Sequence, residues 1–194
     1  MSLKSPKTIA FLISLLIVYS LDQLTKHWIN TTIRYADRIE VIPGLFDITH
    51  ARNGGGAFSF FADGPFEQRM VFFVGTTVFA IALLLVFFRK LRSDEILSAT
   101  ALGVVLGGAL GNLTDRLRFG EVVDFLDVHL FGGYTWPTFN IADSAIVIGV
   151  ILLVVEIFMA KEVVGDEARG EEDEPSDPPN HTDPGGGTAT ANSG

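Results

Sequence analysis

Long apolar runs separated by polar stretches dominate this sequence. Four of them approach the length of about 20 residues that a helix needs to cross the hydrocarbon core of a bilayer. Because lipid offers the backbone no hydrogen-bond partners, each run is predicted to be helical. The pattern therefore predicts an all-α membrane protein with four transmembrane helices, at about residues 8–26, 70–88, 96–113 and 139–160.

Two polar stretches, 27–69 and 114–138, connect these runs and are long enough to hold structure of their own. In the first, Ile39–Ile42 and Leu45–Thr49 are rich in β-branched and aromatic residues and flank Pro43-Gly44. That pattern is typical of a β-hairpin. We therefore expect a small extracytoplasmic β-rich lobe, with both stretches flanking a site as lids.

The third apolar run has small residues at four-residue spacing: Ala99, Gly103, Gly107 and Gly111. At that spacing they share one face of a helix. A smooth face lets another helix approach closely, so the third helix is predicted to pack tightly against a neighbour.

Basic residues near the ends of the runs predict the orientation. The short connection 89–95 and the N-terminus are dense in Lys and Arg, which favours the cytoplasmic side. The first run follows Lys4 and Lys7 like a signal peptide, but it continues into Asp22 and Lys26 without a small-residue cleavage site, so we expect a retained helix. With four spans, both termini are then cytoplasmic, although the opposite loops also contain arginines.

The composition is typical of a membrane protein. The distribution of charge distinguishes a C-terminal tail from the preceding residues. Hydrophobic residues make up 48% of the 194 residues, and mean hydropathy is +0.37. Residues 161–194 contain nine acids and two bases, which is most of the net charge of −9. This Pro- and Gly-rich acidic stretch has little to bury, so we expect a disordered cytoplasmic tail following a membrane domain at 1–160.

Polar residues within the membrane are energetically costly, so each one requires a structural or functional explanation. Here they lie on one side of the predicted bundle. Some have simple explanations. Lys26 could snorkel to the interface, or form a helix-surface pair with Asp22. Asp115 and Asp127 are expected to be solvated acids, whereas Asp143 lies inside a helix start and needs a partner. The gathered residues are Asp22, Lys26, Asn53, Asn112, Asp115, Arg116, Asp124, Asp127, Asn140 and Asp143.

The side chains available restrict the chemistry. The chain has no Cys, and its histidines lack metal-ligand spacing to one another. A Ser/His pairing of Ser144 or Ser59 with His129 or His50 lacks the sequence context of a nucleophile elbow. Two aspartates held close share one proton, so that one takes a proton from water while the other donates one. The spacing leaves open which aspartates pair, and a transporter or a purely structural membrane subunit remain as alternatives.

Five motifs, in order, resemble those of the lipoprotein signal peptidases, the bacterial signal peptidase II family, over roughly residues 8–160. One departure is Gly56, where the family often has Ala. The motifs are Asp22-Gln-Leu-Thr-Lys26, Asn53-Gly-Gly-Gly-Ala-Phe-Ser59, Gly107-Gly-Ala-Leu-Gly-Asn-Leu-Thr-Asp-Arg116, Val122-Val-Asp-Phe125 and Trp136-Pro-Thr-Phe-Asn-Ile-Ala-Asp143.

The resemblance implies an aspartic endopeptidase with Asp124 and Asp143 as the catalytic pair. It implies a multi-pass protein of the bacterial inner membrane, with its site at the outer face, that needs no metal or organic cofactor. We expect the protein to be a monomer. Its partners would be membrane lipid and, as substrates, lipid-modified prolipoproteins cut before the diacylglyceryl cysteine. Because residues 1–160 are nearly neutral, their charge predicts no nucleic-acid partner. The implied substrate-binding or site-supporting residues are Asp22, Lys26, Asn53, Gly55, Asn112, Arg116 and Asn140.

Overall fold

The computed structural model describes residues 5–55, 64–130 and 133–172, and the side chains only as far as residue 159. Met1–Phe158 form one compact unit and Met159–Gly194 a second. Every polar residue that the sequence brought forward as a candidate lies in the first unit.

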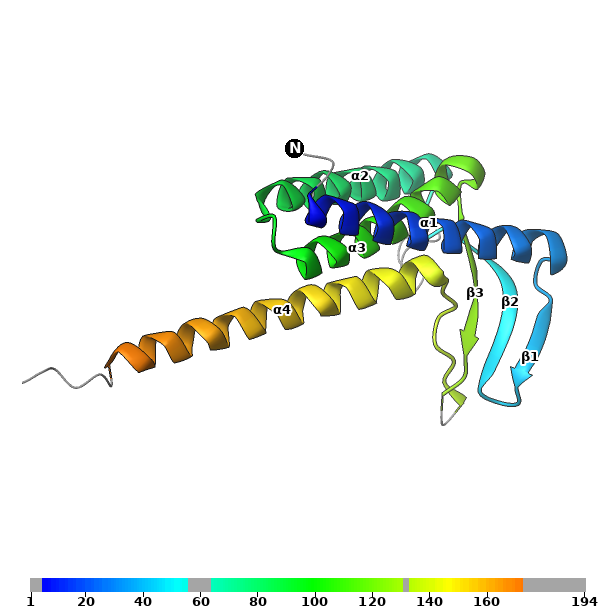
Figure 1. The fold of residues 1–194 in the computed structure, drawn as a ribbon. Helices are drawn as coiled ribbons and strands as arrows, with labels where there is room; N and C mark the ends of the chain where they lie inside the picture. The colour runs from blue at the N-terminus through cyan, green and yellow to red at the C-terminus, as the bar shows by residue number, and fades with distance from the viewer. Residues whose placement is uncertain (1–4, 56–63, 131–132, 173–194) are drawn as a thin grey trace, which may run out of the picture. The chain divides into compact units, whose positions relative to one another are not determined.

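Within the described residues, four helices are long and apolar enough to cross a membrane, which confirms the predicted helical frame (Figure 1). They are α1 (Pro6–Thr32), α2 (Phe66–Lys90), α3 (Ile96–Phe119) and α4 (Ile141–Glu172).

All four helices continue beyond the limits that apolar length predicts, and α2 runs from Phe66 to Lys90 rather than over 70–88. α1 runs to Thr32 rather than residue 26, because Ile29 is fully buried against the sheet and extends the apolar face. α3 ends at Phe119, where Gly120 adopts a left-handed conformation with φ of 76°. α4 continues to Glu172, so residues 161–172 of the expected tail are helical. Those residues include Lys, Ala, Arg and Glu, which have high helix propensity. The disorder expected of 173–194 lies outside the described residues.

A three-stranded antiparallel sheet lies at one end of the helices (Figure 1). β1 (Arg38–Ile42) and β2 (Phe46–Asn53) form the predicted hairpin around Gly44, whose φ of 70° favours glycine. β3 (Val122–Val128) pairs with β2. The sequence did not predict this third strand, because its pairing partner lies in a different connecting segment and local pattern does not show long-range pairing.

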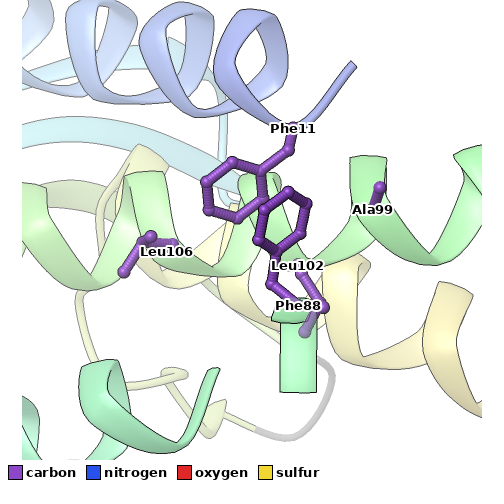
Figure 2. Close-up of a cluster of buried hydrophobic side chains, with 5 residues drawn as sticks. All are labelled: Phe11, Phe88, Ala99, Leu102 and Leu106. Atoms are coloured by element: carbon purple, nitrogen blue, oxygen red, sulfur yellow. The ribbon is translucent and has the colours of Figure 1, made fainter. Parts of the chain in front are cut away.

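In the part of the chain that the structure describes, two clusters of buried apolar side chains hold the frame together. The first joins three helices, and its centre is a stacked pair of rings, Phe11 on Phe88, with centroids 4.1 Å apart (Figure 2). The second places Ile29 of α1 and Ile33, the residue that follows α1, against Val123 and Phe125 of β3. The second cluster therefore anchors the sheet to the end of α1.

The small-residue face of α3 packs against α1, as predicted. A Cβ built on Gly103 would lie 2.4 Å from the carbonyl oxygen of Phe11, and one on Gly107 would lie 2.8 Å from that of Leu15. Both separations are below any normal contact, so the two backbones touch only because these positions are glycine. This contact sets the relative positions of the polar residues further along α1 and α3.

Candidate active site

The first turn of α4 holds Asp143 through a reciprocal capping arrangement. Asn140 immediately precedes the helix, and its Oδ1 accepts a hydrogen bond from the backbone N–H of Asp143 at 3.0 Å. The Asp143 carboxylate accepts one from the backbone N–H of Asn140 at 3.3 Å. Such a capping box satisfies two otherwise unpaired N–H groups and fixes both side chains. Asp143 is thus held in place while remaining partly exposed.

Two asparagine side chains connect the carboxyls of Asp124 and Asp143. Asn140 Nδ2 donates to Asp124 Oδ1 at 2.7 Å, which joins α4 to β3. Asn112 of α3 donates to Asp143 Oδ1 at 2.8 Å, and its own oxygen accepts from Asn140 Nδ2 at 3.2 Å. Acids from separate segments therefore enter one hydrogen-bonded network.

The turn after β2 contacts Asp124 on its other oxygen. Asn53 Nδ2 donates to Asp124 Oδ2 at 3.0 Å, and Asn53 Oδ1 accepts from the N–H of Gly55 at 3.0 Å. The carbonyl of Gly55 lies 3.4 Å from Arg116 Nη2. The Arg116 guanidinium also lies 5.0 Å from the ring centroid of Phe73 and attracts the charges of both Asp143 and Asp124. Gly56 and Ser59, from the same motif, lie outside the described residues.

Lys26 lies beneath this network and is only 2% exposed, so the expectation that it snorkels to the interface is wrong. Its Nζ is 2.9 Å from Asp22 Oδ2 and 3.0 Å from Asp115 Oδ2, and it donates to Asn112 Oδ1 at 2.8 Å. The expectation of a solvated Asp115 is also wrong, because its side chain is 2% exposed and its Oδ2 accepts the N–H of Val123. A buried lysine requires such partners.

Asp22 belongs to the same buried group rather than to a helix surface. Its Oδ1 accepts the N–H of Ala142, in the first turn of α4, at 3.0 Å. Gln23 was missed by the sequence reading, although it stands inside the first motif. Its Nε2 lies 3.2 Å from Asp22 Oδ2 and 3.3 Å from Asp115 Oδ1. Gln23 therefore donates to both carboxylates that pair with Lys26.

The surroundings of Asp124 favour its protonated form. The side chain is 1% exposed, and this burial, together with the nearby negative charge of Asp143, raises its pKa to about 7. Hydrogen bonds from Asn53 and Asn140, and the charge of Lys26, act in the opposite direction but are smaller effects. A carboxyl of this kind holds a proton near neutral pH.

Asp127, the other candidate acid on β3, does not join this network. It is 2% exposed, so the expectation of a solvated acid is wrong, and Arg38 Nη2 pairs with its Oδ2 at 2.9 Å. The structure thus separates two aspartates that sequence spacing left equivalent.

The alternative serine–histidine chemistry finds no support among the described residues. Ser144 Oγ donates to the carbonyl of Asn140 at 3.1 Å. His50 Nδ1 bonds the carbonyl of Ile33, and His129 contacts Asp47 and Thr135. None of these contacts joins a histidine to Ser144, and Ser59 lies outside the described residues.

Comparison with known proteins identifies the family. A sequence model of the family described as signal peptidase (SPase) II matches residues 14–159. The chain is 53% identical over 137 residues to the lipoprotein signal peptidase of Geobacter sulfurreducens, covering 71% of this chain and 84% of that protein. The chain belongs to the signal peptidase II family. The lipoprotein signal peptidase of Syntrophus aciditrophicus is 46% identical over 154 residues, covering 79% and 95%.

Solved structures agree with the family assignment. One, of a bacterial membrane enzyme, superposes with a TM-score of 0.70 at 38% identity, covering 78% of this chain and 88% of that one. A second bacterial membrane enzyme gives a TM-score of 0.67 at 39% identity, covering 76% and 91%. The predicted fold class and resemblance are therefore confirmed. As a member of the signal peptidase II family, the chain is a multi-pass membrane peptidase rather than a transporter.

Proposed function

We propose that this protein is an aspartic endopeptidase that removes signal peptides from lipid-modified prolipoproteins, cutting before the diacylglyceryl cysteine. The main support is the network in which Asn140 and Asn112 connect the carboxyls of Asp124 and Asp143. Both relatives compared above carry the name lipoprotein signal peptidase, which supplies the substrate class.

The two carboxyls differ in surroundings, and the difference suggests their starting roles. Asp124 is buried with a pKa raised to about 7, so it carries the shared proton. Asp143 is partly exposed and receives N–H donors from Asn112 and Asn140, which suits an ionised carboxylate within reach of water. Asp143 is therefore the proposed general base, and Asp124 the proposed general acid.

The proposed reaction balances its protons within this pair. Asp143 takes a proton from water as the water oxygen bonds to the scissile carbonyl carbon, and Asp124 gives its proton to the carbonyl oxygen. In the second step the C–N bond breaks, Asp143 donates its proton to the leaving amine, and a hydroxyl of the diol returns one to Asp124. The asparagines and Arg116 position the carboxyls and the substrate backbone.

The position of the site suits a lipid-anchored substrate. β3 and the start of α4, which carry Asp124 and Asp143, lie at the end of the helices opposite the connection between α2 and α3 (Figure 1). If that connection is cytoplasmic, the site lies at the outer face of the membrane. A diacylglyceryl chain in the same bilayer would then hold the scissile bond at this level, which reduces the entropy lost on binding.

Asp124→Asn and Asp143→Asn are each expected to lower cleavage of a diacylated precursor by at least about 10²-fold, because acid–base catalysis commonly contributes that much. The assay uses purified full-length protein in detergent and scores release of the signal peptide. Asp94→Asn is the matched control, since Asp94 is exposed in the connection between α2 and α3.

The same assay with an unmodified precursor tests the substrate class. We expect much slower cleavage than with the diacylated form. Normal turnover by either active-site variant contradicts the aspartic mechanism, and equal turnover of both precursors contradicts the requirement for lipid.

A further inference from the structure

A second group of charged residues lies in the sheet, away from the network of Asp124 and Asp143. Asp47 of β2 and Asp127 of β3 stand directly opposite each other in the strand register. Their side chains are 7% and 2% exposed. Like charges directly across a sheet repel each other, and burial increases the repulsion. This pair therefore requires a cation.

His129 completes a set of three ligand atoms. Its Nε2 is 3.0 Å from Asp47 Oδ2 and 3.8 Å from Asp127 Oδ2, and all three atoms lie within 4.8 Å of one another. Metal–ligand distances of 2.0–2.2 Å in a tetrahedral site place neighbouring ligand atoms about 3.4 Å apart. The distances from His129 Nε2 to the two aspartate oxygens, 3.0 Å and 3.8 Å, lie just below and just above this separation.

Two further observations suit a metal ligand set. His129 Nδ1 lies 3.1 Å from Thr135 Oγ1, and an outer partner of this kind fixes a ring orientation in which Nε2 faces the two aspartates. Asp127 Oδ1 is buried and has no hydrogen-bond partner among the described residues. Asp127 could therefore bind a metal ion through both carboxylate oxygens, as a bidentate ligand.

Arg38 supplies the cation in this structure. Its Nη1 is 3.0 Å from Asp47 Oδ2 and its Nη2 is 2.9 Å from Asp127 Oδ2. The Arg38 side chain is 53% exposed, so it can swing into solvent with little loss of buried contact. His129 is 22% exposed, which leaves an approach from solvent. A divalent ion would neutralise both carboxylates, whereas the guanidinium neutralises one charge.

We propose that Asp47, Asp127 and His129 form a binding site for a divalent transition-metal ion, with Zn²⁺ the best fit, and that Arg38 competes with the ion for the carboxylates. Mixed carboxylate and imidazole ligands favour Zn²⁺ over Mg²⁺, which prefers six oxygen ligands. The bound ion would cross-link β2, β3 and the segment that carries His129. The site takes no part in the proposed proton transfers of Asp124 and Asp143.

Calorimetric titration of the untagged full-length protein with ZnCl₂ or MgCl₂ tests the proposal. We expect one Zn²⁺ per chain at this site and no comparable Mg²⁺ binding. His129→Gln should abolish that isotherm, and Thr135→Val should weaken it by about tenfold, as loss of an outer partner typically does. His27→Gln is the matched control, because His27 is an exposed histidine on α1.

Arg38→Gln is the variant that separates a metal site from a simple ion-pair cluster. Competition predicts tighter Zn²⁺ binding in this variant, and a larger rise of its Tm on adding Zn²⁺ than the wild type shows. The proposal is overturned if the wild type gives no Zn²⁺ isotherm, if His129→Gln leaves the isotherm unchanged, or if Arg38→Gln weakens it. Because binding and Tm are measured without substrate, these outcomes do not depend on peptidase activity.

Discussion

At the residue scale, the site depends on how a few buried charges are satisfied. Lys26 balances Asp22 and Asp115 at 2.9 Å and 3.0 Å, with all three side chains almost fully buried. A buried ion pair is weak evidence for net stability, but removing one partner leaves an uncompensated charge. The group around Lys26 should therefore tolerate single substitutions poorly.

Lys26→Met tests this arrangement. We expect the free energy of unfolding to fall by about 3–5 kcal/mol, because two carboxylates lose their buried counter-charge. Thermal unfolding in detergent measures the loss, and Lys90→Met, at an exposed lysine, is the control. Adding Asp22→Asn to Lys26→Met should restore part of the stability, and an unchanged Tm for the single variant would contradict the burial of a charged group.

The raised pKa of Asp124 makes stability depend on pH. The folded pKa is about 7 and the ordinary value is 3.8, so between these values the folded chain holds a proton that the unfolded chain has released. The contribution of Asp124 to stability is therefore fully present below pH 3.8 and is lost as pH rises to about 7.

Measuring Tm at pH 5 and pH 8 tests this linkage. The wild type should lose more stability between the two pH values than Asp124→Asn does, because the variant cannot titrate at this position. Other groups that titrate contribute to both proteins and cancel in the comparison. An equal drop in the two proteins would show that Asp124 titrates near its ordinary value.

At the element scale, the contact of α1 with α3 sets the geometry of the site. Both helices carry site residues near the ends that lie beside the sheet, and the glycine face of α3 determines how closely they approach. A Cβ on Gly111 would lie 2.3 Å from Asp22 Oδ2, so this face reaches as far as the buried charges. The packing of α3 against α1 therefore also determines where the buried charges of the site lie.

Gly103→Ala is expected to destabilise the protein by about 1–3 kcal/mol, as overpacking does, since the new methyl group would meet the carbonyl oxygen of Phe11. Gly75→Ala is the matched control, because nothing lies within 4 Å of a Cβ built there and both glycines stand inside apolar helices. Equal Tm values for the two variants would mean that α1 and α3 do not pack through this face.

At the scale of the whole molecule, every proposed site residue falls within the region that matches the family. That region ends at residue 159, whereas the acidic tail follows it. The candidate network is built from α1, β2, α3, β3 and α4, all of whose contributing residues precede the tail.

Removing Gly165–Gly194 is therefore expected to leave cleavage of a diacylated precursor nearly unchanged. The truncated and full-length proteins are purified side by side, and kcat/KM is measured in the same detergent. A large loss of turnover on truncation would show that the tail contributes to the peptidase rather than being a solvated appendage.

Local pattern in the sequence determined the helices and the hairpin, because an apolar run and a turn at Pro43-Gly44 are short-range properties. It also identified most of the site residues as candidates, because polar residues are rare in apolar segments and stand out there. Tertiary structure alone decided which acids meet. Asp124 and Asp127 lie on the same strand, but packing of β3 against the helices places Asp124 beside Asn140. Pairing of the strands in the sheet instead places Asp127 within reach of Arg38 on β1. Burial of Lys26 was likewise decided by packing, because a charge enters the interior only when partners from distant segments surround it.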